Sequence, residues 1–187
     1  MLYKYIIAVI AFGYPLVVIQ SAQRRFDLEV QEYHCTNRTS LVRQLHCNLT
    51  KIANGRYYAD FLFEITRNLD KEARIQFTSY YTPQNAKRAV KFVDLNMKVC
   101  DVLSQSMTLP LIKTIINEVR KTSNLPYACP IKGNFTYKFV NLTLDANILP
   151  TYTPLISYNF STKFYEHQKL LAILDVSGAT VARSKGK

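Results

Sequence analysis

The residues with the greatest chemical potential in this chain are three histidines and four cysteines. His34 and His46 directly precede Cys35 and Cys47, whereas His167 stands apart from any cysteine. Imidazole and thiolate groups could hold zinc, but a closed zinc site usually has tighter ligand spacing, and the chain contains no C-x-x-C pair. The two dipeptides therefore favour structural disulfides, and we expect neither a metal nor another cofactor.

Acid–base and nucleophilic chemistry find little support in the sequence. No nucleophile elbow, metalloprotease helix, phosphate-binding loop or dinucleotide fingerprint is present. Asp60 and Glu64 fall on one face of a predicted strand, where a solvated polar face explains them better, because paired carboxylates become catalytic only in a cleft that shifts their pKa. We expect no enzyme; the alternative, a hydrolase, would need His34 or His167 beside an acid and a nucleophile.

Cys35, Cys47, Cys100 and Cys129 form an even set, which an oxidising compartment would pair. Four cysteines allow three connectivities. Pairing of Cys35 with Cys47 and of Cys100 with Cys129 is favoured because each bond would close a local segment. In the chain-entropy model the second bond, which closes a loop of roughly 30 residues, stabilises the fold by about 3 to 4 kcal/mol.

The beginning of the chain has the pattern of a secretory signal. Lys4 supplies a short positive region, residues 5–19 are apolar and uncharged, and residues 20–22 lead into Arg24-Arg25. The apolar run is shorter than the roughly 20 residues that span a bilayer, so we predict removal of residues 1–22 and secretion, with a retained anchor as the alternative. Five glycosylation acceptors, which must face water, support the same route: Asn37, Asn48, Asn134, Asn141 and Asn159.

The formal net charge of +11 raises the question of an acidic partner. A basic, aromatic-rich surface can indicate nucleic acid, but the secretory route and the scattered placement of the charges argue against it. Net charge serves solubility before any specific partner, so a plain solvated surface is one reading. An acidic membrane surface, a membrane receptor or a sulfated matrix are the partners that we expect otherwise.

Residues 23–187 are predicted to form a single domain. Alternation of apolar and polar residues indicates about eight strands, and Asn54-Gly55 is a strong hairpin signal. Opposite parity on the two sides of Phe139 and Val140 predicts a β-bulge there. The expected class is all-β with one short helix, an antiparallel sandwich or barrel.

The helix is expected between Cys100 and Cys129. Thr108 can cap its start, Pro110 is tolerated in a first turn, and Asn124-Leu-Pro126 ends it. Its apolar residues recur at helical spacing: Leu111, Ile112, Ile115, Ile116 and Val119. We predict a helical clasp, pinned onto a sheet by a disulfide.

Thirteen Tyr and ten Phe, without Trp, concentrate on the inward faces of the predicted strands. They could fill a solid core, or they could line an apolar pocket between sheets that stand apart. Periodicity does not separate these alternatives. The predicted pocket lining is Phe61, Phe63, Phe77, Leu95, Met97, Phe135, Tyr137, Phe139, Tyr158 and Phe160.

A longer pattern, Val-Cys100-Asp101 … Ser123-Asn124-Leu-Pro-Tyr-Ala-Cys129-Pro130 … Leu149-Pro150, resembles an insect-expanded family of secreted proteins with the domain of unknown function 1091, or DM8 domain. The resemblance covers about residues 91–181. It implies a relation to lipid-recognition proteins of the ganglioside-activator and ML type, and hence an immunoglobulin-like β-sandwich or β-cup that holds a lipid between two sheets. It also implies no catalytic residues, and a disulfide from Cys100 to Cys129 that ties the clasp to the sheet.

Some insect relatives in this family, the chemosensory B proteins, are associated with taste and pheromone perception. The resemblance therefore implies a secreted glycoprotein that binds a hydrophobic small molecule or lipid, with a role in chemosensory or pheromone perception. The alternative is an extracellular protein-interaction module with a solid core and no ligand pocket. An exposed apolar patch without a pocket would favour that alternative.

Overall fold

The computed structural model describes residues 24–104 and 110–183, so the predicted signal segment 1–22 and the predicted cap Thr108 lie outside the described residues. Eight strands and three helical segments make up the described part of the chain. In chain order they are β1 (Phe26–Asn37), β2 (Val42–Ala53), β3 (Arg56–Ile65), β4 (Arg74–Pro83), β5 (Val90–Lys98), α1 (Val99–Leu103), α2 (Pro110–Lys121), β6 (Thr136–Asp145), the 3-10 turn η1 (Ala146–Ile148), β7 (Ile156–Glu166) and β8 (Lys169–Ala182).

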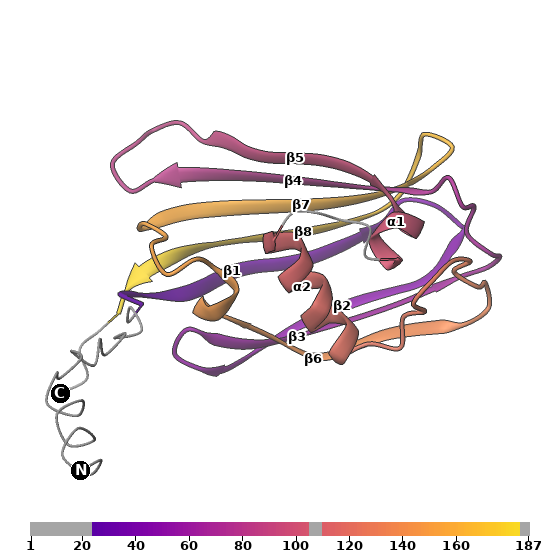
Figure 1. Ribbon diagram of the computed structural model, residues 1–187, viewed down its shortest axis with the longest axis horizontal. Helices are drawn as coiled ribbons and strands as arrows, with labels where there is room; N and C mark the ends of the chain where they lie inside the picture. Colours follow the sequence, from indigo (N-terminus) through magenta and orange to yellow (C-terminus); the bar gives the residue numbers. More distant parts are fainter. Residues whose placement is uncertain (1–23, 105–109, 184–187) are drawn as a thin grey trace, which may run out of the picture.

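The strands form two antiparallel sheets that face each other, as Figure 1 shows. The first sheet has the order β1-β8-β7-β4-β5, and the second has the order β2-β3-β6. Alternating side chains on each strand turn inward; on β3, for example, Tyr57, Ala59 and Ile65 are buried. The β-sandwich predicted from the apolar alternation is confirmed.

The turn between β2 and β3 is the two-residue hairpin that Asn54-Gly55 predicts. Ala53 pairs with Arg56, and Gly55 adopts φ +67°. Tight hairpin turns of this kind need positive φ, which glycine adopts without steric cost. The turn fixes the register of the second sheet.

The predicted β-bulge in β6 is also present. The β3–β6 register shifts between Ala59 and Phe61, which places one extra residue on β6 between Phe139 and Leu142. Asn141, at this position, has φ 57° and is exposed. The bulge lets the apolar residues before and after it face the interior of the same sandwich.

Two disulfides tie the sandwich together, with the predicted pairing. Cys35–Cys47 joins β1 to β2, which are edge strands of the two sheets. Cys100–Cys129 joins α1 to the segment that follows α2. One bond therefore ties the sheets to each other directly, and the other holds the helices between β5 and β6 (Figure 1).

The clasp differs from the prediction in one respect. Residues from Val99 onward leave the first sheet and form the short helix α1, so a second helix precedes the predicted one. After α2 the chain hydrogen-bonds to β6: the Asn124 backbone N–H donates to the Lys138 carbonyl (3.2 Å), and the Asn124 side-chain oxygen accepts from the Lys138 N–H (2.8 Å). The clasp therefore bridges both sheets, with Asn124 as its attachment to the second.

The buried side chains form two clusters along the sandwich. One cluster has Leu28, Val30, Tyr57 and Tyr158 at its centre. The other is built from Val42, Ile65, Ala73, Val99, Leu103, Ile131, Tyr137 and Leu171, and includes residues of α1. Helix α1 therefore packs in the second of these clusters.

The outer surface agrees with the expected positions of the acceptor asparagines. All five are exposed: Asn37, Asn48, Asn134, Asn141 and Asn159. No helix within the described ranges has the length and apolar character that a membrane crossing requires.

Candidate functional site: an apolar cavity between the sheets

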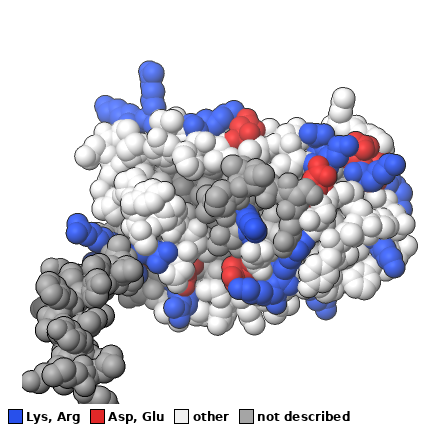
Figure 2. Space-filling view, in the orientation of Figure 1, with Lys and Arg blue, Asp and Glu red and all other residues white. Residues whose placement is uncertain are grey.

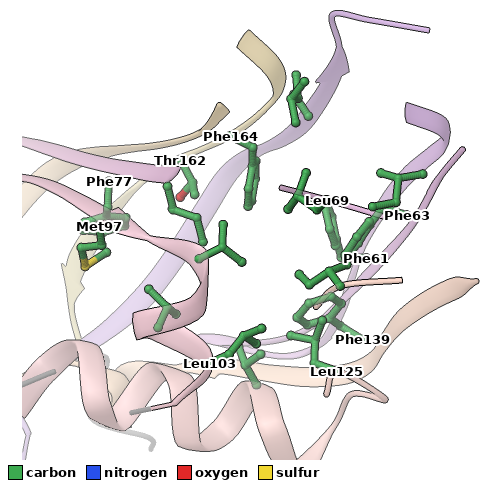
Figure 3. Close-up of a pocket in the computed structure, with 18 of the residues that line it drawn as sticks. Phe61, Phe63, Leu69, Phe77, Met97, Leu103, Leu125, Phe139, Thr162 and Phe164 are labelled. Atoms are coloured by element: carbon green, nitrogen blue, oxygen red, sulfur yellow. The ribbon is translucent and has the colours of Figure 1, made fainter. Parts of the chain in front are cut away.

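A cavity of about 290 Å³ lies between the two sheets and the helices. Phe61, Phe63 and Phe139 form its wall on the second sheet, and Phe77 and Met97 belong to the first sheet (Figure 3). The helices close a third side with apolar residues from α1 and α2: Val99, Val102, Leu103, Ile115, Ile116 and Val119. Both sheets and the clasp therefore contribute to one space.

The lining is almost wholly hydrocarbon. Among the described residues that line the cavity, Thr162 is the single polar one, and none is charged. An ionised group held inside would lack a partner and would lose its hydration, which costs several kcal/mol or more. The cavity is thus suited to the uncharged, apolar part of a ligand.

The size of the cavity limits what fits. Small-molecule pockets in proteins typically measure about 300 to 1,000 Å³, and this cavity, about 290 Å³, lies at the lower end. At about 30 Å³ for each water-sized group, roughly ten methylene-sized groups could occupy it. A medium-length hydrocarbon chain or a small ring system matches this volume.

The wall on the second sheet is a cluster of aromatic rings. The Phe61 and Phe139 rings meet edge to face with centroids 5.3 Å apart, and the Phe63 ring stacks on Tyr137 with centroids 4.9 Å apart. Such ring pairs add about 0.5 to 1.5 kcal/mol beyond the area that they bury. The contacts hold this wall in a defined shape.

The sequence-predicted lining divides into two groups in the structure. Phe61, Phe63, Phe77, Met97 and Phe139 line the cavity. Leu95, Phe135, Tyr137, Tyr158 and Phe160 are not among the lining residues. Alternation identified the inward faces of the strands, but not where along them the sheets leave a space.

Contacts elsewhere account for Tyr158, Phe160 and Tyr137. Tyr158 belongs to the other cluster, where Phe160 packs against it. The Tyr137 hydroxyl is occupied by Lys132, accepting from its backbone N–H (2.7 Å) and donating to its carbonyl (3.2 Å). Leu95 pairs with Phe77 in the register of the first sheet without reaching the cavity.

The prediction that Phe135 lines the pocket is wrong, because its side chain is 46% exposed. The second sheet takes up the chain only at Thr136, so the inward alternation of Tyr137 does not extend back to Phe135. Its ring instead meets the Tyr137 ring edge to face, with centroids 4.8 Å apart.

The sequence prediction of the pocket missed the clasp. Ile115, Ile116 and Val119 of α2 line the cavity, as do residues of α1. The helical spacing of these α2 residues was a usable signal, because an amphipathic helix must bury its apolar stripe against something. Val42, at the start of β2, and Leu69, in the loop between β3 and β4, carried no comparable signal.

The polar residues considered for chemistry have structural partners. Glu64 accepts from Arg43 (2.6 Å) and from the Thr136 hydroxyl (3.1 Å), and Asp60 accepts from the Asn141 N–H (2.8 Å). Within the described residues, no group of three or more His, Cys, Asp or Glu side chains could hold a metal ion. Asp60 and Glu64 therefore help to hold β3 in register with β2 and β6.

A second hollow of about 410 Å³ lies on the outer face of the first sheet. Its polar groups already bond to one another: Arg74 Nε donates to Asn96 Oδ1 (2.6 Å), and the Tyr165 hydroxyl approaches Gln76 Oε1 (3.4 Å). Groups that satisfy each other leave little for a ligand to bind. The inner cavity is the stronger candidate site.

Comparison with known families agrees with the resemblance noted in the sequence. Residues 74–160 match the model of a family described as "Protein of unknown function (DUF1091)". The matched segment runs from β4 into β7 and contains both helices, the Cys100–Cys129 disulfide and Asn124. It therefore includes the whole clasp and a large part of the cavity wall. No curated protein matches the chain.

Proposed function

We propose that this chain, which carries the DUF1091 pattern across its clasp, is a secreted glycoprotein that binds a hydrophobic small molecule or lipid between its sheets. The observation that carries the proposal is the cavity of about 290 Å³, lined by apolar side chains and Thr162. The disulfides suit an oxidising compartment. The five exposed acceptor asparagines suit the same route.

Packing energetics support an occupant. The side chains around an empty apolar space lose the dispersion contacts that close packing would give them, and this space measures about 290 Å³. Whole domains are stable by only about 5 to 15 kcal/mol. A ligand that fills this space would recover part of the lost packing energy and would raise the stability of the fold.

The ligand class follows from the lining. An uncharged hydrocarbon chain or ring enters the cavity, and the Thr162 hydroxyl could bond one ester, ketone or hydroxyl group. The resemblance to the chemosensory B proteins makes taste and pheromone cues the first ligands to test. A role in chemosensory perception is part of the proposal.

The test compares two substitutions on the same face of β5. Met97 lines the cavity, and Leu95, two residues away, does not. Met97→Trp should fill the space and weaken binding of a fluorescent hydrophobic probe by about tenfold or more, equivalent to about 1.4 kcal/mol. Leu95→Trp should keep the affinity of the unaltered protein. Circular dichroism shows whether both variants fold.

Native mass spectrometry and organic extraction of protein secreted from eukaryotic cells would then identify a co-purifying ligand. Equal probe affinity in the two Trp variants would contradict the cavity as the site. A folded protein that carries no extractable ligand and binds no fatty-acid, sterol or hydrocarbon probe would favour the protein-interaction module instead.

A further inference from the structure

The β4–β5 hairpin exposes large apolar side chains at its tip, defined as residues 80–92. Phe92 is 67% exposed, Val90 is 46% exposed and Tyr80 is 37% exposed. Val90 pairs with Tyr81, whose ring contacts Phe92, so Val90 and Phe92 lie on one side of the hairpin, whereas Tyr80 pairs with Lys91 on the other side. Exposed apolar side chains that gather on one side commonly mark an interaction site. None of residues 80–92 lines the cavity, so the tip is separate from the proposed ligand site.

The same tip is basic. Lys87, Arg88 and Lys91 lie in it, and no Asp or Glu occurs from residue 81 to residue 93. Lys91 pairs with Asp94 at 2.8 Å, whereas Lys87 and Arg88 make no ion pair with any described residue. On the face drawn in Figure 2, Lys and Arg side chains stand at the upper left end, where this hairpin turns in Figure 1.

The fold holds Phe92 at the surface. The β4–β5 register shifts between Ser79 and Tyr80, so Phe92 is an extra residue on β5 with no partner across the ladder. Its ring meets the Tyr81 ring edge to face, with centroids 5.9 Å apart. A bulge at the edge of a sheet re-aims a side chain in this way, and the ring contact keeps the side chain in place.

We infer that the hairpin tip docks the protein on an anionic lipid surface. Aromatic and aliphatic side chains enter the headgroup region, while neighbouring Lys and Arg attract acidic lipids. Lys87 and Arg88 supply the attraction, and Phe92 and Val90 supply the insertion. A sulfated polysaccharide would use the charges but would give the apolar side chains no partner, so a membrane explains more of the tip.

The test measures sedimentation of the secreted protein with phosphatidylcholine vesicles, with and without phosphatidylserine. The unaltered protein should bind the phosphatidylserine vesicles more tightly, and salt should weaken the binding. Phe92→Ser and Lys87→Glu/Arg88→Glu should each lower the binding by about tenfold. Both variants should keep their hydrophobic-probe affinity, which separates this proposal from the proposed function.

Two controls match the changes elsewhere on the surface. Tyr127→Ser removes an aromatic side chain that is 74% exposed, and Lys71→Glu/Lys169→Glu reverses two exposed charges, all near the end of the first sheet that is opposite the hairpin tip. Both controls should bind vesicles as the unaltered protein does. Absence of vesicle binding, or equal loss in the controls, would overturn the proposal. Loss with the charge reversals alone, together with competition by heparin, would overturn it in favour of a polyanion site.

Discussion

At the scale of single residues, Glu166 is the most unusual polar group of the described chain. It is 5% exposed, accepts two hydrogen bonds from Arg67 (3.0 and 2.6 Å) and accepts a third from the Asp70 backbone N–H (2.8 Å). The hydrogen bond from Arg67 is the main cause that lowers the pKa of Glu166. The carboxylate thereby ties the end of β7 to the loop between β3 and β4.

Glu166→Gln should lower the free energy of unfolding by about 2 kcal/mol at neutral pH, the usual value of hydrogen bonds to a charged group. Because the folded-state pKa is lowered, this stabilisation is complete above the ordinary glutamate pKa of about 4.3 and disappears as the pH falls through the folded-state value. Urea unfolding at neutral and acid pH measures the loss of unfolding free energy and its dependence on pH.

Glu72→Gln is the matched control, since Glu72 pairs with Lys98 (2.8 Å) on the exposed surface. Exposed ion pairs contribute little, so this variant should unfold nearly as the unaltered protein does. A stability difference for Glu166→Gln that persists undiminished in acid would show that the charge is not its origin.

At the scale of elements, the contact of β1, β8 and β7 depends on Gly178. It pairs with Val30 on one side and with Tyr158 on the other. The Tyr158 hydroxyl crosses this point to donate to the Glu29 carbonyl at 3.0 Å, and burial raises the pKa of Tyr158. Only a residue without a Cβ leaves room for that hydroxyl.

Gly178→Ala should destabilise the protein by about 1 to 3 kcal/mol, as overpacking of a core usually does. The added Cβ would collide with the Glu29 carbonyl oxygen and with the Tyr158 hydroxyl. Urea unfolding followed by tyrosine fluorescence measures the change. Ser177→Ala, on the neighbouring position, serves as the control. Unchanged stability of Gly178→Ala would mean that the strands shift apart at little cost.

The strands were predictable because one face of each is buried and the other is solvated, so their sequences alternate. The turn at Asn54-Gly55 and the bulge after Phe139 were predictable for similarly local reasons. The order of strands within each sheet is set by contacts between distant segments, which no local pattern encodes. The same limit applies to the cavity: Phe77 and Phe160 share inward-facing alternation and stack at 5.9 Å, yet only Phe77 lines it.

At the scale of the whole molecule, the two disulfides have different tasks. Replacing Cys100 and Cys129 by Ser should cost about 3 to 4 kcal/mol, and replacing Cys35 and Cys47 should cost about 3 kcal/mol, by the loop-length model. Thermal or urea unfolding measures these losses. Only the first pair holds the helices that line the cavity, so only its loss should accelerate release of a bound hydrophobic probe. Equal release rates from the two variants would contradict this assignment.

The Cys35–Cys47 bond links the two sheets covalently along one edge of the sandwich. This edge is formed by β1 and β2, whereas the clasp lies across the opposite edge, between β5 and β6. Evolution can then alter the clasp while the hydrogen-bonded sheets stay unchanged. Replacements at Ile115, Ile116 and Val119 would change the shape of the cavity without removing a ladder hydrogen bond, so the cavity can vary while the sheets stay the same.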